Sequence, residues 1–328
     1  MRLLILGTGG MAENHAEAFK AIEGVEVVAA CDVSAVRVDA FSENHDIHNR
    51  FTRLEDALAW NRFDAVANVT PDAVHHPTTL ALVGAGKHVF CEKPLAESYE
   101  KAAEMADAAQ QAGVVNMVNL TYRNVAPLQK AREMVMAGEM VMAGEIGQVR
   151  HFEASYLQSW LVSKAWGDWK TESKWLWRLS TRHGSNGVLG DVGIHILDFA
   201  TYAIGSDVER ASAHLKTFEK AENNHIGEYV LDANDSFVMM AEYANGALGV
   251  IHASRWATGH LNELRLRIHG DKGALEILHT PTGSSLRGSI GEDIETPVWR
   301  DIDAGTVETN YQRFARAVAD GTELEPSF

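Results

Sequence analysis

The sequence predicts an α/β protein with an N-terminal doubly wound parallel sheet, followed by a second part built on an antiparallel sheet. Over the first 120 residues, short apolar runs alternate with longer amphipathic stretches, and a glycine-rich turn follows the first run. Later runs alternate apolar and polar residues. The 328 residues suffice for two domains, which we expect at 1–122 and 123–328.

Five short apolar runs in the first domain are expected to form strands. They show no alternation, which is typical of strands buried on both faces of a parallel sheet. The expected strands are 3–6, 25–30, 64–69, 87–91 and 114–119. The expected helices between and after them are 10–22, 35–44, 53–60, 74–84 and 98–112.

The turn after the first strand, "GTGGMA", fits the G-x-G-x-x-G/A pattern of dinucleotide-binding loops. Gly7 permits the tight turn, Gly9 lets the backbone approach a pyrophosphate, and Ala12 lets the helix pack closely on the strand. The N-terminus of the following helix can bind an anion. The remaining residues expected to contact the cofactor in this turn are Thr8, Gly10 and Met11.

An acidic residue ends the next strand, because Asp32 follows Ala12 by 20 residues. A carboxylate there can accept hydrogen bonds from an adenosine ribose, so we expect a Rossmann domain. The alternative is a glycine-rich turn with a helix-capping Asp. Because Asp32 would repel a 2′-phosphate, NAD is favoured over NADP. Arg37 is placed to pair with such a phosphate, or it is a solvated charge.

Composition argues against several partners. The net charge of −16 disfavours nucleic acid, and no apolar stretch reaches the roughly 20 residues that span a bilayer. Cys31 and Cys91 each end an apolar run, so we expect reduced, buried thiols in a cytoplasmic protein. No cysteine–histidine spacing typical of a metal site is present, so we expect no metal.

The second domain begins with a helical stretch from about 124 to about 143. The expected strands are 148–157, 235–243, 247–255 and 263–270, with an Asn-Gly hairpin signal between the second and third. Residues 279–306 are expected to form a loop, and 310–321 a helix ending at a glycine. "MVMAGE" occurs twice in tandem, at 134–139 and 140–145, which predicts a loop or bulge near Gly138.

Five segments together resemble one family of dehydrogenases. The segments are "GTGGMA" at 7–12, "TPDAVH" at 70–75, "EKPLA" at 92–96, "YRNVAP" at 122–127 and "GDVGIHILD" at 190–198. In this order they are similar to the glucose-fructose oxidoreductase, inositol dehydrogenase and rhizopine-catabolism family. The resemblance implies a C-terminal α/β domain with a large, mainly antiparallel sheet for substrate binding and oligomerisation. It also implies NAD(P)-dependent oxidation or reduction of a carbinol carbon of a sugar, cyclitol or related polyol, in a homo-oligomer (dimer or tetramer).

The resemblance also assigns catalytic residues. It places Lys93 at the junction of cofactor and substrate, with Asp191 and His195 completing the polar site. From the sequence itself, Thr70 and Pro71 end the third apolar run near the expected cofactor site, and His75 could face that site from the next helix; a capping turn with an exposed histidine is the alternative. Glu92 is a further expected cofactor contact, or it pairs with Lys93 or holds the loop, and Arg123 is an expected substrate contact.

The chemistry of these side chains suits hydride transfer. Histidine can accept a hydroxyl proton near neutral pH, and Lys93 can hydrogen-bond the reacting oxygen. Asp191 and His195 are four residues apart, which puts them on one face of a helix, so a helix-stabilising contact is the alternative. Two other functions stay open: a glycosidase that retains NAD, and a non-catalytic dinucleotide-sensing regulator.

Five of the eight tryptophans lie between residues 160 and 177, after Tyr156. Aromatic faces suit the C–H faces of sugars, so we expect Tyr156, Trp160 and Trp175 in the substrate pocket; packing or subunit contact is the alternative for most of these aromatics. The same region is basic. If some of its cations face the pocket, the substrate would carry a carboxylate or phosphate; these cations are Lys164, Lys170, Lys174, Arg178 and Arg182.

Overall fold

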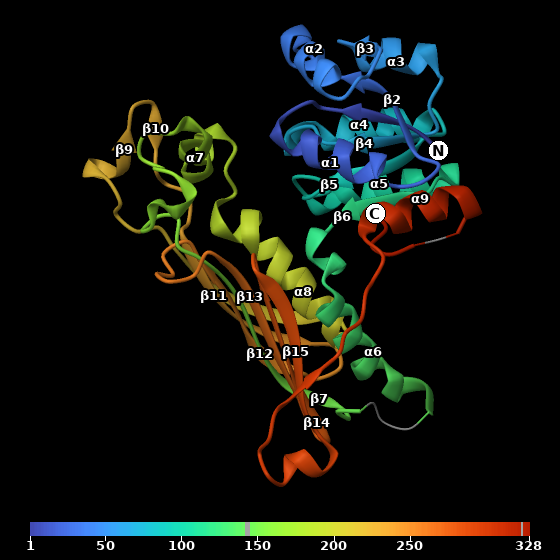
Figure 1. Ribbon diagram of the computed structural model, residues 1–328. Helices are drawn as coiled ribbons and strands as arrows, with labels where there is room; N and C mark the ends of the chain where they lie inside the picture. The colour runs from blue at the N-terminus through green and yellow to red at the C-terminus, as the bar shows by residue number, and fades with distance from the viewer. Residues whose placement is uncertain (142–144, 323) are drawn as a thin grey trace. The chain divides into compact units, whose positions relative to one another are not determined.

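The computed structural model describes residues 1–141, 145–322 and 324–328, and the chain forms two compact units (Figure 1). The first unit comprises Met1–Thr121 together with Glu308–Phe328, and the second comprises Tyr122–Val307. The predicted boundary near residue 122 coincides with this division. The predicted assignment of every later residue to the second domain is corrected, since 308–328 belongs to the first unit.

The first unit contains a six-stranded parallel sheet in the order β3-β2-β1-β4-β5-β6. The strands are β1 (Arg2–Leu6), β2 (Glu26–Cys31), β3 (Asn49–Phe51), β4 (Ala65–Asn68), β5 (His88–Glu92) and β6 (Asn116–Asn119). The chain leaves β1 toward β2 on one side and returns to β4 on the other. Ligands of such sheets bind at this switch point, beyond the carboxyl ends of the strands. The sequence did not predict β3, which has only three residues, none of them buried.

Helices cover both faces of this sheet. They are α1 (Gly10–Lys20), α2 (Ala35–Asn44), α3 (Leu54–Trp60), α4 (Asp72–Gly84), α5 (Tyr99–Ala112) and α9 (Asn310–Asp320). The predicted C-terminal helix is confirmed as α9, which has a Thr309–Gln312 capping box and ends at Gly321. Fully buried Phe314 of α9 packs with Phe19 and Phe90, and this contact explains why the C-terminal segment belongs to the first unit.

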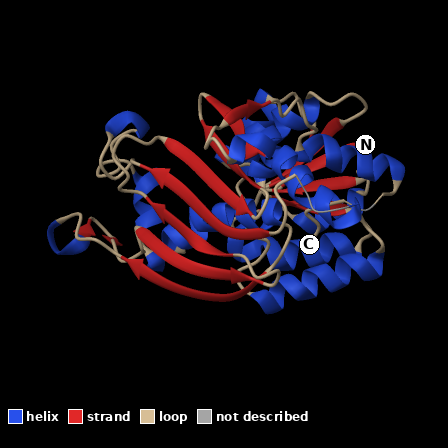
Figure 2. Ribbon diagram, turned by 90° about the horizontal axis from the view of Figure 1, so that it is seen from below, coloured by secondary structure: helices blue, strands red, loops and turns tan. Residues whose placement is uncertain are grey.

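The second unit is built on an eight-stranded sheet in the order β16-β15-β14-β13-β7-β12-β11-β8. Its strands are β7 (Val149–Gln158), β8 (Val208–Lys216), β11 (Ser236–Tyr243), β12 (Leu248–Ser254), β13 (Asn262–Gly270), β14 (Gly273–Thr280), β15 (Gly283–Ile290) and β16 (Arg300–Ile302). All neighbours are antiparallel except β7 and β12, and the strands form one curved layer (Figure 2). A short hairpin joins β9 (His225–Ile226) and β10 (Tyr229–Val230).

Helices α6 (Ala126–Val141) and α8 (Ile194–Ile204) pack against one face of this sheet, while α7 (Ser173–Leu176) is a short turn. In β11, Phe237, Met239 and Ala241 are buried beneath the helices, whereas Val238 and Met240 are exposed on the opposite face. The period of two therefore marks a sheet with one covered face.

Two predictions for the second unit are wrong. Residues 279–306 are not a loop, since they contain β15, a short 3₁₀ turn (Gly291–Ile294) and β16. β15 has few apolar residues, and its pairing with β14 determines its conformation. The predicted break near Gly138 is also wrong, because α6 continues through it to Val141. The part of the tandem repeat at 142–144 lies outside the described residues.

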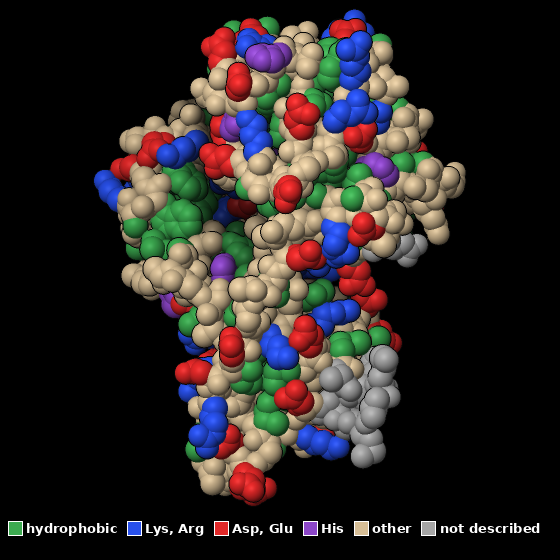
Figure 3. Space-filling model, turned by 45° about the vertical axis from the view of Figure 1, so that its right-hand side comes forward, with side chains coloured by type: hydrophobic (Ala, Val, Ile, Leu, Met, Phe, Trp, Pro, Cys, Tyr) green, Lys and Arg blue, Asp and Glu red, His purple; other side chains and the backbone are tan. Residues whose placement is uncertain are grey.

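The structure also bears on the two cysteines, on membrane-spanning helices and on the distribution of surface charge. Burial raises the pKa of the Cys31 thiol to about 12 and also raises that of Cys91, so neither forms a thiolate near neutral pH. Within the described part of the chain, no helix is long and apolar enough to cross a membrane. Basic and acidic side chains are interspersed across the face shown in Figure 3.

Candidate active site

The loop between β1 and α1 has the geometry of an anion cradle. Gly7 has a φ of +88°, and a Cβ atom there would lie 2.7 Å from the carbonyl oxygen of Val69, so only glycine fits. A Cβ atom on Gly9 or Gly10 would meet nothing within 4 Å. Gly9 also supplies no capping side chain to the first turn of α1. The backbone at this helix end is therefore accessible to a phosphate.

Asp32 lies directly after β2 and is held beside this loop. Its carboxylate accepts hydrogen bonds from the backbone N–H of Thr8 (2.9 Å), the Thr8 hydroxyl (3.0 Å) and the backbone N–H of Ser34 (2.9 Å). Burial by itself would raise the pKa of Asp32, but hydrogen bonds from Arg37, Thr8 and Ser34 lower it to about 2. The ionised Asp32 carboxylate, a hydrogen-bond acceptor, is thus fixed at the position where the sequence predicts binding of the adenosine ribose.

Arg37 from α2 forms an ion pair with Asp32, which neither sequence-based alternative anticipated. Its Nη2 lies 2.8 Å from Asp32 Oδ1 and its Nε lies 3.3 Å from Oδ2. The guanidinium therefore offsets part of the charge with which Asp32 would repel a 2′-phosphate.

His75 in α4 does not face open space, so its predicted role as a cofactor contact is corrected. The ring is completely buried. Its Nδ1 lies 2.8 Å from the carbonyl oxygen of Pro94, and its Nε2 lies 2.7 Å from that of Thr70. His75 thus links Thr70, in the segment with Pro71 that follows β4, to the loop after β5.

Glu92 at the end of β5 is likewise a buried support rather than an exposed cofactor contact. Its Oε1 lies 2.8 Å from His15 Nε2 and accepts a hydrogen bond from Asn119 Nδ2 (2.7 Å), and its Oε2 accepts one from the backbone N–H of Lys93 (3.2 Å). Burial would raise the pKa of Glu92, yet His15 and Asn119 lower it overall. An ionised Glu92 therefore fixes the backbone of Lys93, which precedes a cis peptide bond to Pro94.

A pocket in the second unit brings together the predicted substrate contacts Tyr156, Trp160, Trp175, Asp191 and His195. It is lined by Tyr156, Gln158, Trp160, Trp166, Trp175, Arg178, Asp191, Val192, His195 and Asn262. Trp160 and Trp175 stack with ring centroids 5.2 Å apart. The tryptophan-rich segment thus forms an aromatic wall beside Asp191 and His195.

Asp191 lies in a π-helical turn (Leu189–Gly193) that leads into α8. Gly193 allows this entry to pack on the sheet, since a Cβ atom there would lie 2.9 Å from the Phe237 ring. Two arginines hold the Asp191 carboxylate. Arg178 Nη1 lies 3.1 and 3.0 Å from its two oxygens, and Arg255 Nη2 lies 2.9 Å from Oδ2.

Arg255 was not among the predicted residues, and it is completely buried behind the pocket. Its Nη1 donates to the carbonyl oxygen of Arg178 (3.0 Å), and its guanidinium lies 5.0 Å from the centroid of the Trp160 ring. Burial lowers the pKa of Arg255, while the Asp191 charge raises it. Arg255 therefore connects the carboxylate, the Arg178 backbone and the aromatic wall.

A closed hydrogen-bond ring supports the opposite wall. The Tyr122 hydroxyl lies 2.5 Å from that of Tyr156, which donates to Asn262 Oδ1 (2.6 Å), and Asn262 Nδ2 donates back to Tyr122 (2.9 Å). Burial raises the pKa of both phenols, so they stay protonated. His195 packs edge-on against Tyr122, with ring centroids 5.0 Å apart. Gln158 extends the ring by donating to Asn262 Oδ1 (2.8 Å).

Arg123 is not among the residues that line this pocket, and its predicted substrate contact stays a prediction. Its Nε and Nη2 donate to Asp198 Oδ1 at 3.1 and 2.5 Å, and its guanidinium lies 4.6 Å from the Tyr202 ring centroid. The pair joins the segment before α6 to α8. Among residues 1–141, 145–322 and 324–328, no group of three or more His, Cys, Asp or Glu residues could hold a metal ion.

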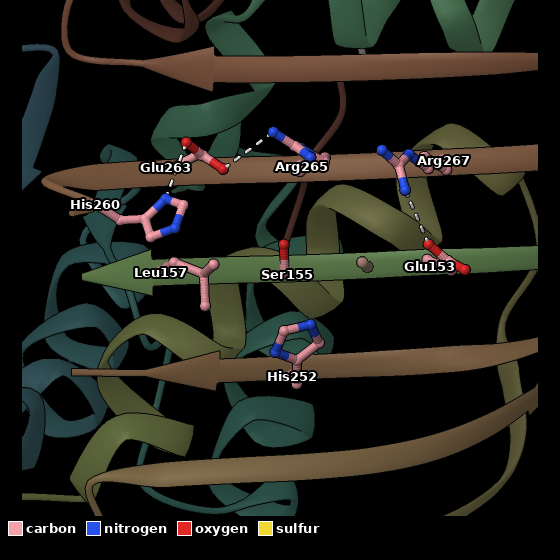
Figure 4. A pocket seen from close by; sticks show the side chains of 9 residues that line it. Glu153, Ser155, Leu157, His252, His260, Glu263, Arg265 and Arg267 are labelled. Atoms are coloured by element: carbon pink, nitrogen blue, oxygen red, sulfur yellow. Dashed lines mark hydrogen bonds and ion pairs between the residues drawn. The ribbon is translucent and has the colours of Figure 1, made fainter. Parts of the chain in front are cut away.

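A second hollow lies on the face of the large sheet opposite α6 and α8. In Figure 4, Glu153, Ser155 and Leu157 of β7 lie between His252 of β12 and the charged residues of β13. Arg267 Nη1 lies 3.4 Å from Glu153 Oε2 across the two strands. The other charged residues lining this hollow are His260, Glu263 and Arg265.

Comparison with protein families identifies both units. Residues 1–120 match the model of an oxidoreductase family with an NAD-binding Rossmann fold, and residues 134–276 match the GFO/IDH/MocA C-terminal domain. The chain belongs to the Gfo/Idh/MocA oxidoreductase family. The first unit is accordingly an NAD-binding Rossmann domain, and the loop at Gly7 and the carboxylate of Asp32 fit that cofactor.

Two of the similar proteins bear the names of enzymes that act on sugar derivatives. The chain is 30% identical over 220 residues to a levoglucosan dehydrogenase from Pseudarthrobacter phenanthrenivorans, covering 63% of this chain and 53% of that protein. It is 29% identical over 274 residues to 1,5-anhydro-D-fructose reductase from Ensifer adhaerens, covering 82% and 74%. The crystal structure of an oxidoreductase domain protein from Kribbella flavida superposes with a TM-score of 0.84 at 29% identity, covering 99% of this chain and 91% of that one.

Proposed function

We propose that the protein is an NAD(P)-dependent dehydrogenase that transfers a hydride between the nicotinamide and a carbinol carbon of a sugar, cyclitol or related polyol. The observation that carries the proposal is the pocket in which His195 and Asp191 lie beside stacked Trp160 and Trp175. Aromatic faces bind the C–H faces of sugars, and a nearby imidazole suits removal of a hydroxyl proton.

His195 acts as the general base in this proposal. The oxygens of Asp191 already accept hydrogen bonds from Arg178 and Arg255, so Asp191 is less suited to take a proton and instead positions the substrate. The carbinol O–H proton passes to His195 as the C–H bond gives up a hydride. When bound, NAD⁺ supplies the acceptor for that hydride.

Lys93 is proposed to hydrogen-bond the reacting oxygen and stabilise its developing negative charge. Support comes from the way Glu92 fixes the Lys93 backbone and from the EKP segment shared with the family. Glu92 and His15 are therefore positioning residues for this lysine. NAD is proposed as the preferred cofactor because ionised Asp32 favours ribose hydroxyls over a phosphate.

The test is nicotinamide reduction, followed by absorbance, across a panel of cyclitols, aldoses and sugar acids with NAD and with NADP. His195→Ala should lower kcat by about 10²–10⁴-fold on any substrate found, the usual contribution of a general base. The control is His225→Ala, which changes an exposed histidine outside the pocket. Tight NAD binding without reduction of any compound would overturn this proposal. It would favour the NAD-retaining glycosidase or the dinucleotide-sensing regulator.

We also propose that the outer face of the eight-stranded sheet binds a second copy of the chain. Val238, Met240 and Leu248 are each more than half exposed there. Charges alternate across the neighbouring strands in pairs such as Arg267–Glu276, at 2.6 Å. A two-fold axis would bring this mixed surface onto itself, which allows opposite charges to meet.

Light scattering coupled to size-exclusion chromatography tests the interface. The wild-type protein should have at least twice the mass of one chain, and Met240→Glu should dissociate it. The control is Val36→Glu, which alters a still more exposed apolar residue on α2 in the first unit. A monomeric wild-type protein contradicts the proposal.

We further propose a cytoplasmic location, because Cys31 and Cys91 are both buried and unpaired. Reduced thiols are typical of that compartment. Cell fractionation, with the dehydrogenase activity as the marker, tests this.

A further inference from the structure

On the walls of the aromatic pocket, most hydrogen-bond acceptors have a partner within the protein, whereas several donors do not. Asn262 Oδ1 accepts from both Tyr156 and Gln158, and Gln158 Oε1 accepts from Trp160 Nε1 (3.1 Å). Both oxygens of Asp191 accept from arginines. The acceptors of this pocket are thus largely committed to groups of the protein itself.

Hydrogen-bond donors are still available at the end of the pocket that the tryptophans form. Arg178 uses Nη1 for Asp191, while no contact within the described part of the chain engages its Nε or Nη2. Its side chain is 34% exposed and lies against the face of Trp177. The indole N–H groups of Trp166 and Trp175 are buried and have no hydrogen-bond partner among the described residues. A ligand group that only accepts hydrogen bonds complements this end of the pocket.

The charged groups in and behind the pocket also favour a ligand with a negatively charged acceptor group. Two guanidinium groups, Arg178 and Arg255, share the single carboxylate of Asp191. The guanidinium groups thus outnumber the carboxylate that they share, in a protein whose overall charge is −16. Of the five cations predicted as pocket candidates, only Arg178 lines the pocket, and Lys164 instead pairs with Asp168 at 2.9 Å.

We propose that the substrate is a sugar or polyol acid whose carboxylate binds Arg178. The planar carboxylate accepts two parallel hydrogen bonds from one guanidinium. This inference rests on the proposed dehydrogenase function and names the substrate class of that same pocket.

The first experiment compares matched substrates that differ only at one carbon. D-glucose is compared with D-glucuronate and D-galactose with D-galacturonate, and glucose 6-phosphate represents the phosphate. The acids should be oxidised with a kcat/KM about tenfold or more above that of their neutral partners, the usual effect of one charge-assisted hydrogen bond. Equal or better turnover of the neutral sugars, or of the phosphate, overturns the carboxylate assignment and leaves the dehydrogenase function standing.

Variants of Arg178 separate recognition from structure. Arg178→Gln should abolish the preference for the acid over its neutral partner, and Arg178→Lys should restore part of it. The matched control is Lys164→Gln, which removes a cation from the same segment outside the pocket and should keep the wild-type preference. A preference that survives Arg178→Gln overturns the role of this residue.

A binding measurement keeps the two proposals distinguishable. Glucuronate should quench the tryptophan fluorescence of the wild-type protein without any turnover, because Trp160, Trp166 and Trp175 line the pocket. Binding without reduction of NAD would overturn the dehydrogenase function and support the carboxylate site. Oxidation of neutral sugars with no binding of glucuronate would overturn the carboxylate site and support the dehydrogenase function.

Discussion

The two units of the molecule build their sites in different ways. In the first, the residues that shape the dinucleotide loop are close in sequence, because each lies where one strand of a parallel sheet ends. Gly7, Thr8 and Asp32 come from two consecutive strands. In the second, Arg178, Asp191 and Arg255 come from a tryptophan-rich loop, a π-helical turn and the end of β12. Local sequence can specify the first kind of site, whereas the second depends on the tertiary fold.

The two sites also treat charge differently. Asp32 pairs with one arginine, Arg37, whose side chain is 57% exposed. Asp191 pairs with Arg178 and with Arg255, which has no exposed surface. The arginine of the first ion pair is therefore peripheral, whereas one arginine of the second belongs to the core.

Replacing the two arginines in parallel should give the largest effect and the clearest contrast. Arg255→Met should lower the free energy of unfolding by about 3 kcal/mol, the low end for breaking a buried pair, because Arg178 still accompanies Asp191. Arg37→Met should change it by less than about 1 kcal/mol, as for an exposed pair. Urea unfolding of both variants measures the difference. If both variants lost the same free energy of unfolding, the difference in burial between Arg255 and Arg37 would not affect stability.

Two glycines of the dinucleotide loop should separate stability from binding. Gly7→Ala should destabilise the protein by about 1–3 kcal/mol, because of its positive φ and the short contact with Val69. Gly9→Ala meets no neighbouring atom, so it should leave the melting temperature unchanged while weakening NAD binding. Thermal unfolding and titration with NAD distinguish the two. A Gly9→Ala variant that binds NAD normally would contradict the expected close approach of the pyrophosphate.

Acid should weaken the dinucleotide loop through Asp32. Its pKa falls from the ordinary 3.8 to about 2 in the folded protein, so ionisation favours folding. The contribution, about 2 kcal/mol, is fully present well above pH 4 and is lost as the pH falls from about 4 to 2. Asp32→Asn should remove this part of the pH dependence, as measured by urea unfolding at pH 5 and pH 2.5. If the free energy of unfolding changed equally between pH 5 and pH 2.5 in the wild-type and variant proteins, the contribution of Asp32 would be contradicted.

The smallest effect is expected from metal removal. Dialysis against a chelator should leave NAD reduction unchanged in the presence of substrate, because His195 and Lys93 are proposed to carry out the proton transfer and charge stabilisation. The same treatment of a zinc-dependent alcohol dehydrogenase serves as a positive control. Loss of activity that returns on adding a divalent cation would contradict the proposed chemistry.

Much of the first unit was predictable because its signals are local. Glycine spacing placed the loop at Gly7, and Asp32 ended an obvious apolar strand. Glu92 and His75 were identified as residues of interest, but their burial depends on His15, Asn119 and Pro94 from other elements. No local pattern distinguishes a buried support from a ligand contact.

In the second unit, the tryptophan cluster and the Asp191–His195 spacing indicated the pocket, but its remaining polar residues were missed. Gln158 and Asn262 become neighbours only when β7 pairs with β13. Alternation along "SYLQSW" placed Gln158 on the same side as Tyr156, a signal that was available in the sequence. Arg255 carries no such signal, because a charged residue after a strand is ordinarily expected in solvent.

The return of α9 to the first unit has a consequence for synthesis of the chain. Phe314 packs against Phe19 and Phe90, yet the ribosome makes it only after the whole second unit. Until residues 308–328 have been made, the nascent Rossmann sheet therefore lacks one of its covering helices. The second unit is an insertion between two parts of the first, so the cofactor domain can be completed only after the whole insertion has been translated.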